Sequence, residues 1–303
     1  MKTIKILACS LMAASGFVFT ACGDDDGPAA LPPVGGYNTA DEIAANDLVA
    51  YWPLDGNGNE KLSGTTPANS VGASYVASAK GQSLVLNNGY LNYPAIASLS
   101  ATMPSMTISL WAKVTNNGGP GADGHPAMLF QLSKPNDWGG NINLMSETGW
   151  YASTVDTLIV KGFVKIQTAG GGESGQDSRN SPNPNADDIA AGHVGNANKN
   201  SGKWAHYVIT WDGSLGLFKV YANGQKISNP AWEDRTPDGD VALPLNFFTP
   251  TRPIIGTFAT VVDGTAESWQ RPMNGEIDEI RVWKKVLVEA DINALYQLEA
   301  AGR

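Results

Sequence analysis

Alternation of apolar and polar residues predicts strands along most of the chain. It is clearest in residues 105–114 and in 204–227, where two alternating runs flank an Asp-Gly-Ser turn. The predicted strands are 48–54, 83–86, 90–93, 106–114, 127–132, 141–146, 157–167, 205–211, 217–222, 254–259 and 276–283. Val288, Ile292 and Leu295 recur with helical spacing and predict a short helix near the C-terminus. The pattern therefore predicts an all-β chain that ends in a short helix.

The last predicted strand carries charged residues on both of its faces. Read with a period of two, Asp278 shares the face of Ile280, whereas Glu279 and Arg281 occupy the other face. We expect Ile280 to face the core and the Glu279/Arg281 face to be solvated. Asp278 would then lie at the rim of a hydrophobic layer, where an unpaired carboxylate is costly. We therefore expect it to have hydrogen-bond donors or a cation as partners.

The first predicted strand ends in a turn that is rich in oxygen atoms, with Asp55, Asn57 and Asn59 separated by glycines. Short oxygen-bearing side chains and free carbonyls suit a hard cation such as Ca²⁺. The same composition is typical of an ordinary turn whose side chains bond backbone amides. The residues leave both interpretations open.

Four separated stretches resemble laminin-G-like, concanavalin-A-like domains. They are the first strand with its turn, the strand SMTISLWAKV at 105–114, the hairpin at 204–227 and the closing strand with its helix at 274–296. The resemblance covers most of residues 47–298. Because this one fold hosts lectins, adhesion modules and hydrolases, the resemblance does not decide the function.

The resemblance carries two structural expectations. It implies a two-sheet antiparallel jelly-roll sandwich, concanavalin-A-like, in which the first strand lies near the last. It also implies a structural calcium ion held between the first turn and the closing strand by Asp55, Asn57 and Asp278.

Residues 1–21 have the pattern of a signal peptide. Lys2 and Lys5 precede an apolar segment that is too short for a membrane-spanning helix. The small residues before Cys22 resemble a bacterial lipobox, so we expect Cys22 to carry lipid. The acidic run after it resembles tags that direct lipoproteins of Gram-negative bacteria to the cell surface. We therefore expect an outer-membrane lipoprotein, exposed on the cell surface, that meets the membrane through its lipid anchor only.

The mature chain is expected to consist of a tether and one domain. Residues 22–46 combine Gly, Pro, Ala and Asp without a sustained apolar period, which predicts a flexible tether. The laminin-G-like domain is expected over residues 47–303. Within it, 115–126 and 168–203 are expected to be long loops, and their roles are left open.

Charge and cysteine usage exclude some function classes. The chain has 29 acidic and 20 basic residues and a formal net charge of −9. No basic cluster occurs, so we expect no binding to nucleic acid. Loss of Cys9 with the signal peptide and lipidation of Cys22 would leave no thiol for a disulfide.

Candidate catalytic residues are few. The segment EIDEI (276–280) partly matches the E-x-D-x-E motif of laminarinase-type β-glucanases, but Ile280 occupies the last carboxylate position. The segment also lies in the last strand rather than mid-chain, and we interpret it as structural. We interpret His206 as structural too, and His125 and His193 lack the spacing of a zinc site.

Loop tryptophans are the better candidates for binding. Trp138, Trp150, Trp232 and Trp269 lie in or next to loops rich in Asn, Gly, Pro or acidic residues. Exposed aromatic rings can stack on sugars while polar neighbours bond the hydroxyl groups. Partial burial of the ring as a loop anchor is the alternative for each of them.

The leading hypothesis is a non-catalytic surface protein that binds a glycan or polysaccharide. The alternatives are a protein-binding adhesion or scaffold module, and a glycoside hydrolase. Loop tryptophans that converge on one groove would favour glycan binding. A flat apolar patch would favour a protein partner, and paired carboxyl groups in a cleft would favour an enzyme.

Overall fold

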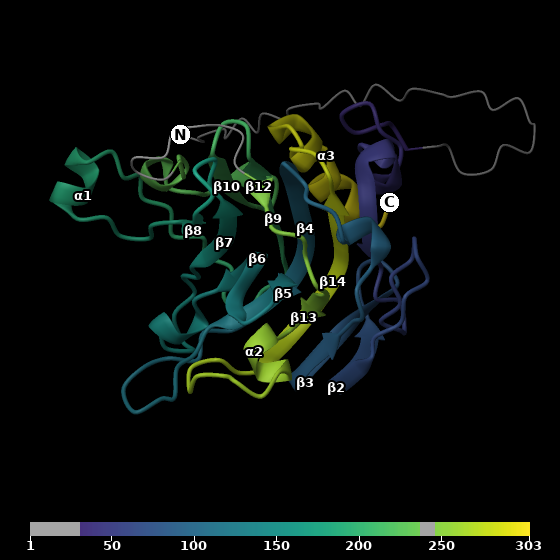
Figure 1. The fold of residues 1–303 in the computed structure, drawn as a ribbon, viewed down its shortest axis with the longest axis horizontal. Coiled ribbons are helices and arrows are strands. Elements are labelled where there is room, and N and C mark those ends of the chain that lie inside the picture. Colours follow the sequence, from purple (N-terminus) through teal and green to yellow (C-terminus); the bar gives the residue numbers. More distant parts are fainter. Residues whose placement is uncertain (1–30, 237–245) are drawn as a thin grey trace, which may run out of the picture. The chain divides into compact units, whose positions relative to one another are not determined.

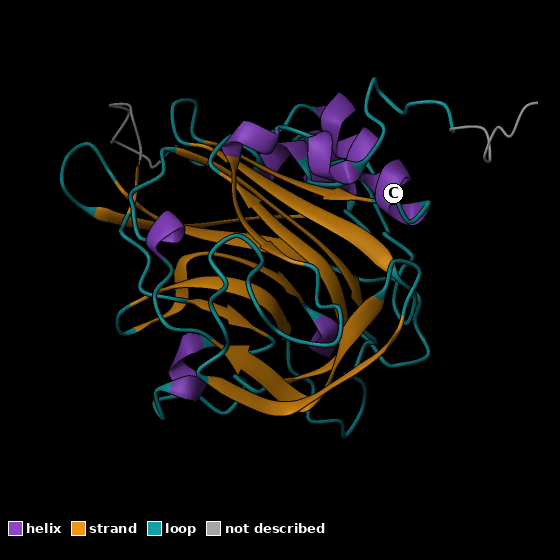
Figure 2. Cartoon of the chain, turned by 90° about the vertical axis from the view of Figure 1, so that its right-hand side faces the viewer, coloured by secondary structure: helices purple, strands orange, loops and turns teal. Residues whose placement is uncertain are grey.

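The computed structural model describes residues 31–236 and 246–303, so the predicted signal peptide and Cys22 lie outside the described residues. Fourteen strands within these two ranges form a curled antiparallel sheet (Figures 1 and 2). The strands are β1 (Leu48–Trp52), β2 (Asn69–Ala77), β3 (Gln82–Asn92), β4 (Ser105–Lys113), β5 (Ala127–Lys134), β6 (Asp137–Ser146), β7 (Val160–Gln167), β8 (Glu173–Arg179), β9 (Ala205–Asp212), β10 (Leu217–Ala222), β11 (Gln225–Lys226), β12 (Asn246–Phe247), β13 (Pro253–Ile255) and β14 (Met273–Trp283). The helices are α1 (Ala186–Ala190), α2 (Ala259–Val262) and α3 (Glu289–Ala300), with 3-10 turns η1 (Ala40–Glu42), η2 (Ala45–Asp47), η3 (Ala97–Leu99), η4 (Thr148–Trp150) and η5 (Pro230–Trp232).

The sheet folds over on itself to enclose its core. Its strands pair in the order β11-β10-β9-β4-β14-β3-β13-β5-β6-β7-β12, while β1, β2 and β8 add to β14, β3 and β7. The curl brings β7 against β10: a Cβ atom on Gly162 of β7 would lie 2.4 Å from a ring carbon of Phe218 in β10. Glycine is needed here because the two faces approach too closely for any side chain. The predicted concanavalin-A-like jelly-roll class is confirmed.

The strand β4 and the hairpin β9–β10 form as their sequence patterns predict. Ile108 and Leu110 are fully buried in the core, while Trp111 lies on the other face. After β10, Asn223 and Gly224 form a two-residue turn with φ of 49° and 73°. Positive φ at both positions matches the twist of the flanking strands, which is why the Asn-Gly pair predicts a hairpin turn.

Three segments differ clearly from their predictions, and the first is β2 at Asn69–Ala77, where no strand was predicted. Residues 168–203, predicted as a loop, contain strand β8, which pairs along its whole length with β7. The residues of β8 are almost all polar, because it is an edge strand with little access to the core, so no apolar alternation marks it. The predicted strand 254–259 ends at Ile255, and α2 begins at Ala259.

A β-bulge in β14 overturns the predicted face of Asp278. Opposite β4, Asp278 pairs with Trp111 and Arg281 with Ser109, so β14 has one residue more than its partner. Glu279 accommodates the extra residue with φ of 50°. The bulge reverses the parity, and Asp278 therefore lies on the face of Trp111, opposite the core face of Ile280.

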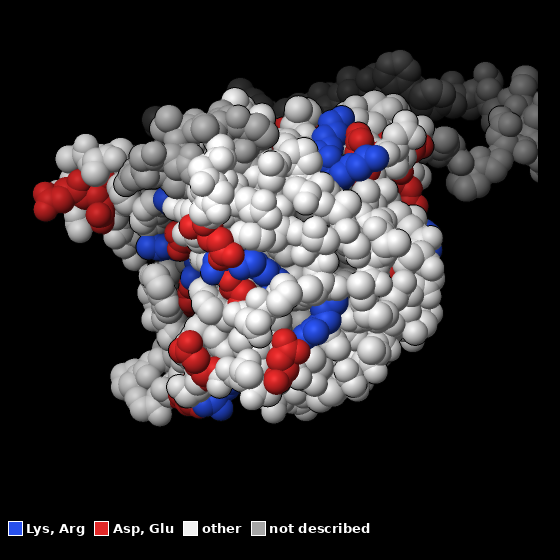
Figure 3. All heavy atoms as spheres, in the orientation of Figure 1, with Lys and Arg blue, Asp and Glu red and all other residues white. Residues whose placement is uncertain are grey.

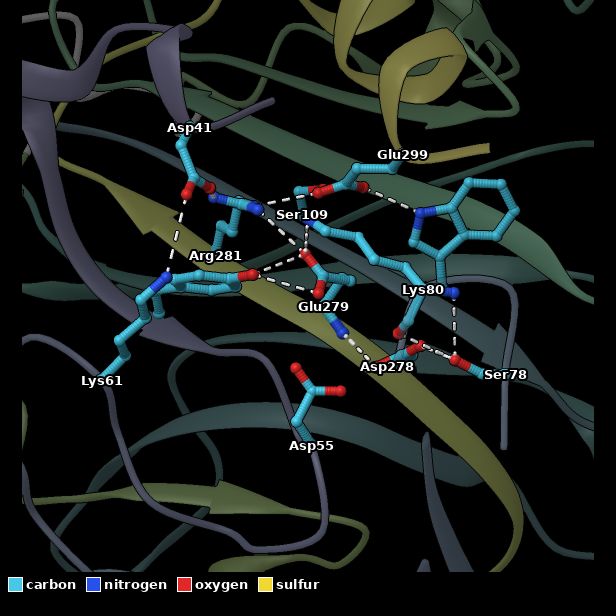
Figure 4. Close-up of polar contacts among 12 residues, drawn as sticks. Asp41, Asp55, Lys61, Ser78, Lys80, Ser109, Asp278, Glu279, Arg281 and Glu299 are labelled. Atoms are coloured by element: carbon cyan, nitrogen blue, oxygen red, sulfur yellow. Dashed lines mark hydrogen bonds and ion pairs between the residues drawn. The ribbon is translucent and has the colours of Figure 1, made fainter. Parts of the chain in front are cut away.

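The Glu279/Arg281 face is buried, not solvated as predicted. The Arg281 side chain is 1% exposed and forms ion pairs of 2.7 Å with Asp41, 2.9 Å with Glu279 and 2.9 Å with Glu299 (Figure 4). Its guanidinium also lies 3.8 Å from the ring centroid of Tyr51. Helix α3 and the N-terminal segment cover this outer face of the sheet, which period-two reasoning cannot foresee.

The folded unit begins at Pro33, ahead of the predicted boundary at residue 47. Ala40 and Ile43 are buried in a second apolar cluster together with residues of β14 and α3. The Trp283 indole donates a hydrogen bond of 3.1 Å to the carbonyl of Ile43. The predicted tether is therefore packed against the domain from residue 33 onward, because its few apolar residues find partners beside α3.

Candidate functional site

Two carboxylates of the predicted metal set lie near each other at the outer face of the sheet. Asp55 follows β1 and Asp278 lies in the bulge of β14 (Figure 4). Asp278 accepts hydrogen bonds of 2.9 Å from the Ser78 hydroxyl and 3.0 Å from the Glu279 amide. Burial raises the pKa of Asp278 to about 8 despite the Ser78 bond, and the charges of Glu279 and Asp55 add to the shift. A cation would relieve both effects.

Asn57, the third predicted ligand, bonds within its own turn. Its amide donates to the Asp55 carbonyl at 3.2 Å and accepts from the Asn59 amide at 2.9 Å. Asp55 accepts from the backbone of Gln82 at 2.7 Å. Among the described residues no group of three or more His, Cys, Asp or Glu side chains surrounds a possible metal position. The fit to Ca²⁺ therefore rests on the Asp55 and Asp278 carboxylates, with backbone carbonyls or water as the remaining ligands.

Trp138 and Trp269 pack against each other in a separate aromatic cluster. Their ring centroids are 5.3 Å apart, and Trp138 also lies 5.0 Å from the ring of Phe163. Both contact Phe258, which is fully buried at the start of α2. These contacts hold the α2 segment on β6, which is the loop-anchor role that the sequence left open.

Trp150 and Trp232 converge on one cavity from different parts of the chain. Between them lies Arg179, whose guanidinium is 4.0 Å from the Trp232 ring centroid and 5.1 Å from that of Trp150. The ring of His193 meets Trp232 edge-on at 4.8 Å. Trp150 is 56% exposed, so a large part of its ring is open to a ligand.

Local hydrogen bonds through Asn229 position three of these side chains, Arg179, His193 and Trp232. Arg179 ends β8, and its carbonyl accepts a bond of 2.9 Å from the Asn229 amide. The buried Asn229 side chain caps η5 by accepting from Ala231 and contacts the His193 ring at 3.0 Å. Asn229 followed by proline is a typical helix start. The cap therefore fixes Trp232 at the end of one turn, next to the end of β8.

The cavity has a volume of about 260 Å³. Its lining combines aromatic rings with hydrogen-bonding groups: Trp150, Tyr151, Ile159, Arg179, Ser181, Pro182, Asn183, Asp188, His193 and Trp232. Such a wall can stack on the apolar face of a sugar ring and bond its hydroxyls. Sequence reasoning found the two tryptophans and missed Arg179, because the polar edge strand that carries it gives no signal.

The sequence profile described as "Concanavalin A-like lectin/glucanases superfamily" matches residues 86–293. The chain belongs to this superfamily. The match includes β4, the hairpin β9–β10 and the bulged strand β14, which are three of the four stretches that carry the resemblance in the sequence. No curated protein matches the chain significantly.

Solved structures of the superfamily fold resemble the chain at low sequence identity. The botulinum neurotoxin serotype G binding domain matches with a TM-score of 0.52 at 12% identity, covering 83% of this chain and 51% of that one. The serotype D ligand-binding domain in complex with N-acetylneuraminic acid gives 0.51 at 12%, covering 86% and 52%. The binding domain of Paraclostridial Mosquitocidal Protein 1 gives 0.51 at 14%, covering 83% and 52%. The chain spans about half the length of these toxin domains, and the likeness shows the fold.

The superfamily includes glucanases, and glycoside hydrolases use a pair of carboxyl groups in catalysis. Glu276 forms an ion pair of 2.8 Å with Lys113. Asp278, Glu279 and Glu299 line another cavity of about 290 Å³ together with Trp111. Glu279 and Glu299 both point to Arg281 as its ion-pair partners, so they serve the network that holds α3 on the sheet. Burial raises the pKa of Glu299, while Arg281 opposes the shift.

His206 has the structural role that its sequence context predicts. It is fully buried, and its Nε2 atom lies 2.7 Å from the Ser109 hydroxyl. Burial lowers the pKa of His206 to about 3, so the ring is neutral at physiological pH. Glu299 is 3.7 Å from the same Nε2 atom rather than from Nδ1, so the three side chains do not form the chain of contacts that activates a serine.

Proposed function

We propose that the protein binds a glycan in the cavity between Trp150 and Trp232. The convergence of these two loop tryptophans on one polar-lined cavity carries the proposal. It is the arrangement expected of a glycan binder rather than of a flat protein-binding surface. One fold neighbour, the serotype D toxin domain, is described in complex with N-acetylneuraminic acid, which supports the same class of ligand.

The two rings play different parts in this binding. Trp232 is held between Arg179 and His193, so it forms a fixed wall of the cavity. Trp150 is largely open and stacks on a sugar ring that enters. The hydrogen-bonding groups of Arg179 and Asn183 then orient the sugar hydroxyls.

Trp150→Ala should weaken glycan binding about 5- to 150-fold, the range of stacking losses of about 1–3 kcal/mol. A glycan panel first identifies a ligand, and calorimetric titration then compares the variants. Trp232→Ala should weaken binding as well, with some loss of stability because its ring is partly buried.

Trp269→Ala is the matched control. It removes the same side chain from the aromatic cluster of α2, so thermal stability should fall while affinity stays unchanged. Loss of affinity in Trp269→Ala but not in Trp150→Ala would refute the assignment. Binding to no member of a broad panel would favour a protein partner. Release of reducing ends from a bound polysaccharide would identify an enzyme instead.

We propose that a lipid on Cys22 anchors the protein at the cell surface. The basic start, the apolar segment and the small residues before Cys22 support this, as does the acidic run at Asp24–Asp26. Across the described residues no helix is long and apolar enough to cross a bilayer.

Cys22→Ser should abolish membrane attachment, because the lipid would be attached to the Cys22 thiol. Detergent-phase partitioning and the migration of the unprocessed precursor measure the change. Cys9→Ser is the control and should leave partitioning as in the natural chain. Equal partitioning of Cys22→Ser and the natural protein would contradict lipidation at this residue.

We propose in addition that Ca²⁺ binds between Asp55 and Asp278. The short separation of the first turn from the closing strand, and the raised pKa of the buried Asp278 carboxyl, support a cation there. The ion would join the two ends of the domain without taking part in chemistry.

A further inference from the structure

The cavity between Trp150 and Trp232 contains a guanidinium without an ion-pair partner. Among the described residues, Arg252, Arg271 and Arg281 each form ion pairs with carboxylates, whereas Arg179 and Arg235 form none. The Arg179 guanidinium contacts the two indole rings and donates a weak bond of 3.3 Å to the Asn180 carbonyl. On the face drawn in Figure 3, several basic side chains lie next to acidic ones. Arg179 is thus a charged group whose nearest neighbours are aromatic rings rather than carboxylates.

The Arg179 guanidinium lies over the two indole rings and is partly out of water. A guanidinium stacked in this way keeps its N–H donors in the plane of the group, where they can bond a planar or tetrahedral anion in pairs. Burial also lowers the pKa of Arg179, which means that its charge lacks part of the solvation it would have in water. An anion that enters the cavity would compensate the guanidinium for this lost solvation.

The nearby carboxylates do not fill this role. Asp188 lines the cavity, but its side chain accepts a bond of 3.0 Å from the Asn185 amide in the capping box of α1. Glu147 is paired with Lys161. Asp177 is near enough to act on the Arg179 charge but forms no ion pair with it among the described residues. The position in front of the guanidinium is thus left to a ligand.

We propose that the glycan carries an anionic group, a carboxylate or a sulfate, which binds Arg179 while a ring of the same glycan stacks on Trp150. This inference rests on the proposed function and names the ligand class for the same cavity. A neutral glycan could still stack on Trp150 but would leave the Arg179 charge without a partner. We therefore expect neutral glycans to bind more weakly.

Matched ligand pairs test this directly. The purified protein is titrated with an oligogalacturonide and with its methyl ester, and with a sulfated galactan oligosaccharide and its desulfated form. The anionic member of at least one pair should bind about 10- to 100-fold more tightly, as expected for a charge-assisted pair of hydrogen bonds. The pair that shows the difference tells carboxylate from sulfate.

Arg179→Gln should abolish this preference, and Arg179→Lys should restore part of it, because lysine keeps the charge without the fork of donors. Arg271→Gln is the control: it removes one positive charge from an exposed ion pair with Asp123. The preference should survive in Arg271→Gln. Its survival in Arg179→Gln would overturn the inference.

The outcomes separate this inference from the proposed function. Equal binding of the anionic and neutral members, with both weakened by Trp150→Ala, would refute the anionic ligand and leave glycan binding intact. Binding of only neutral panel glycans through Trp150 would do the same. Absence of all glycan binding would refute both.

Discussion

Arg281→Met should lower the free energy of unfolding by about 3–5 kcal/mol, the cost typical of removing one partner of a buried ion pair. The substitution leaves Glu279 and Glu299, each 2% exposed, without the guanidinium 2.9 Å away. Methionine replaces much of the arginine's apolar stem, so the loss reflects the charge rather than a cavity. Urea unfolding followed by fluorescence measures the change.

Lys61→Met is the control for this prediction. Lys61 pairs with Asp41 at 3.8 Å, and both side chains are about half exposed, so its loss should cost less than about 1 kcal/mol. In the Arg281→Met background, Glu279→Gln with Glu299→Gln should recover part of the stability, because amides need no counterion. A small effect of Arg281→Met, equal to that of Lys61→Met, would show that the network does not stabilise the fold.

Asp278 should make the protein less stable as the pH rises. Its pKa is raised from 3.8 to about 8, so between these pH values the folded state keeps a proton that the unfolded chain has released. Stability from this group is complete below the unfolded pKa and is lost as pH rises through the folded one, at about 1.4 kcal/mol per pH unit. Asp278→Asn should remove this slope from thermal unfolding in EDTA.

Calcium should reverse the pH effect, because the ion binds the charged carboxylate. At free Ca²⁺ about a hundred times Kd, binding to the folded state alone adds about 2.7 kcal/mol. The gain over EDTA should be largest near pH 8 and absent in Asp278→Asn. Asn57→Ala should leave it nearly unchanged, because that side chain bonds within its own turn. Identical midpoints in EDTA and Ca²⁺ at pH 8 would rule the ion out.

The sequence by itself determined those parts of the protein whose pattern is local. The alternation in 105–114 fixes the two faces of β4, and the Asn223-Gly224 pair fixes the turn after β10. These features depend on neighbours a few residues away, where period and backbone preference act directly. The family and the fold class were expected from the resemblance of four such stretches to laminin-G-like domains.

The candidate site could be predicted only in part. Trp150 and Trp232 are recognisable as loop tryptophans, but so are Trp138 and Trp269, which pack against each other under a helix. The difference lies in which segments meet in space. Arg179 could not be found, because its strand lies at an edge and has little apolar alternation to mark it.

Only the tertiary structure decided the chemistry of the closing strand. One extra residue at the bulge of β14 moves Asp278 away from the core face, while α3 and the N-terminal segment bury Glu279 and Arg281 on the outer face. A bulge is set by the register of the partner strands. Arg281 is buried by the next helix along the chain and by an N-terminal segment that is far away in sequence. A local sequence period predicts which residues share a face of a strand. Which side chains come into contact is decided by packing between segments that are distant in the sequence.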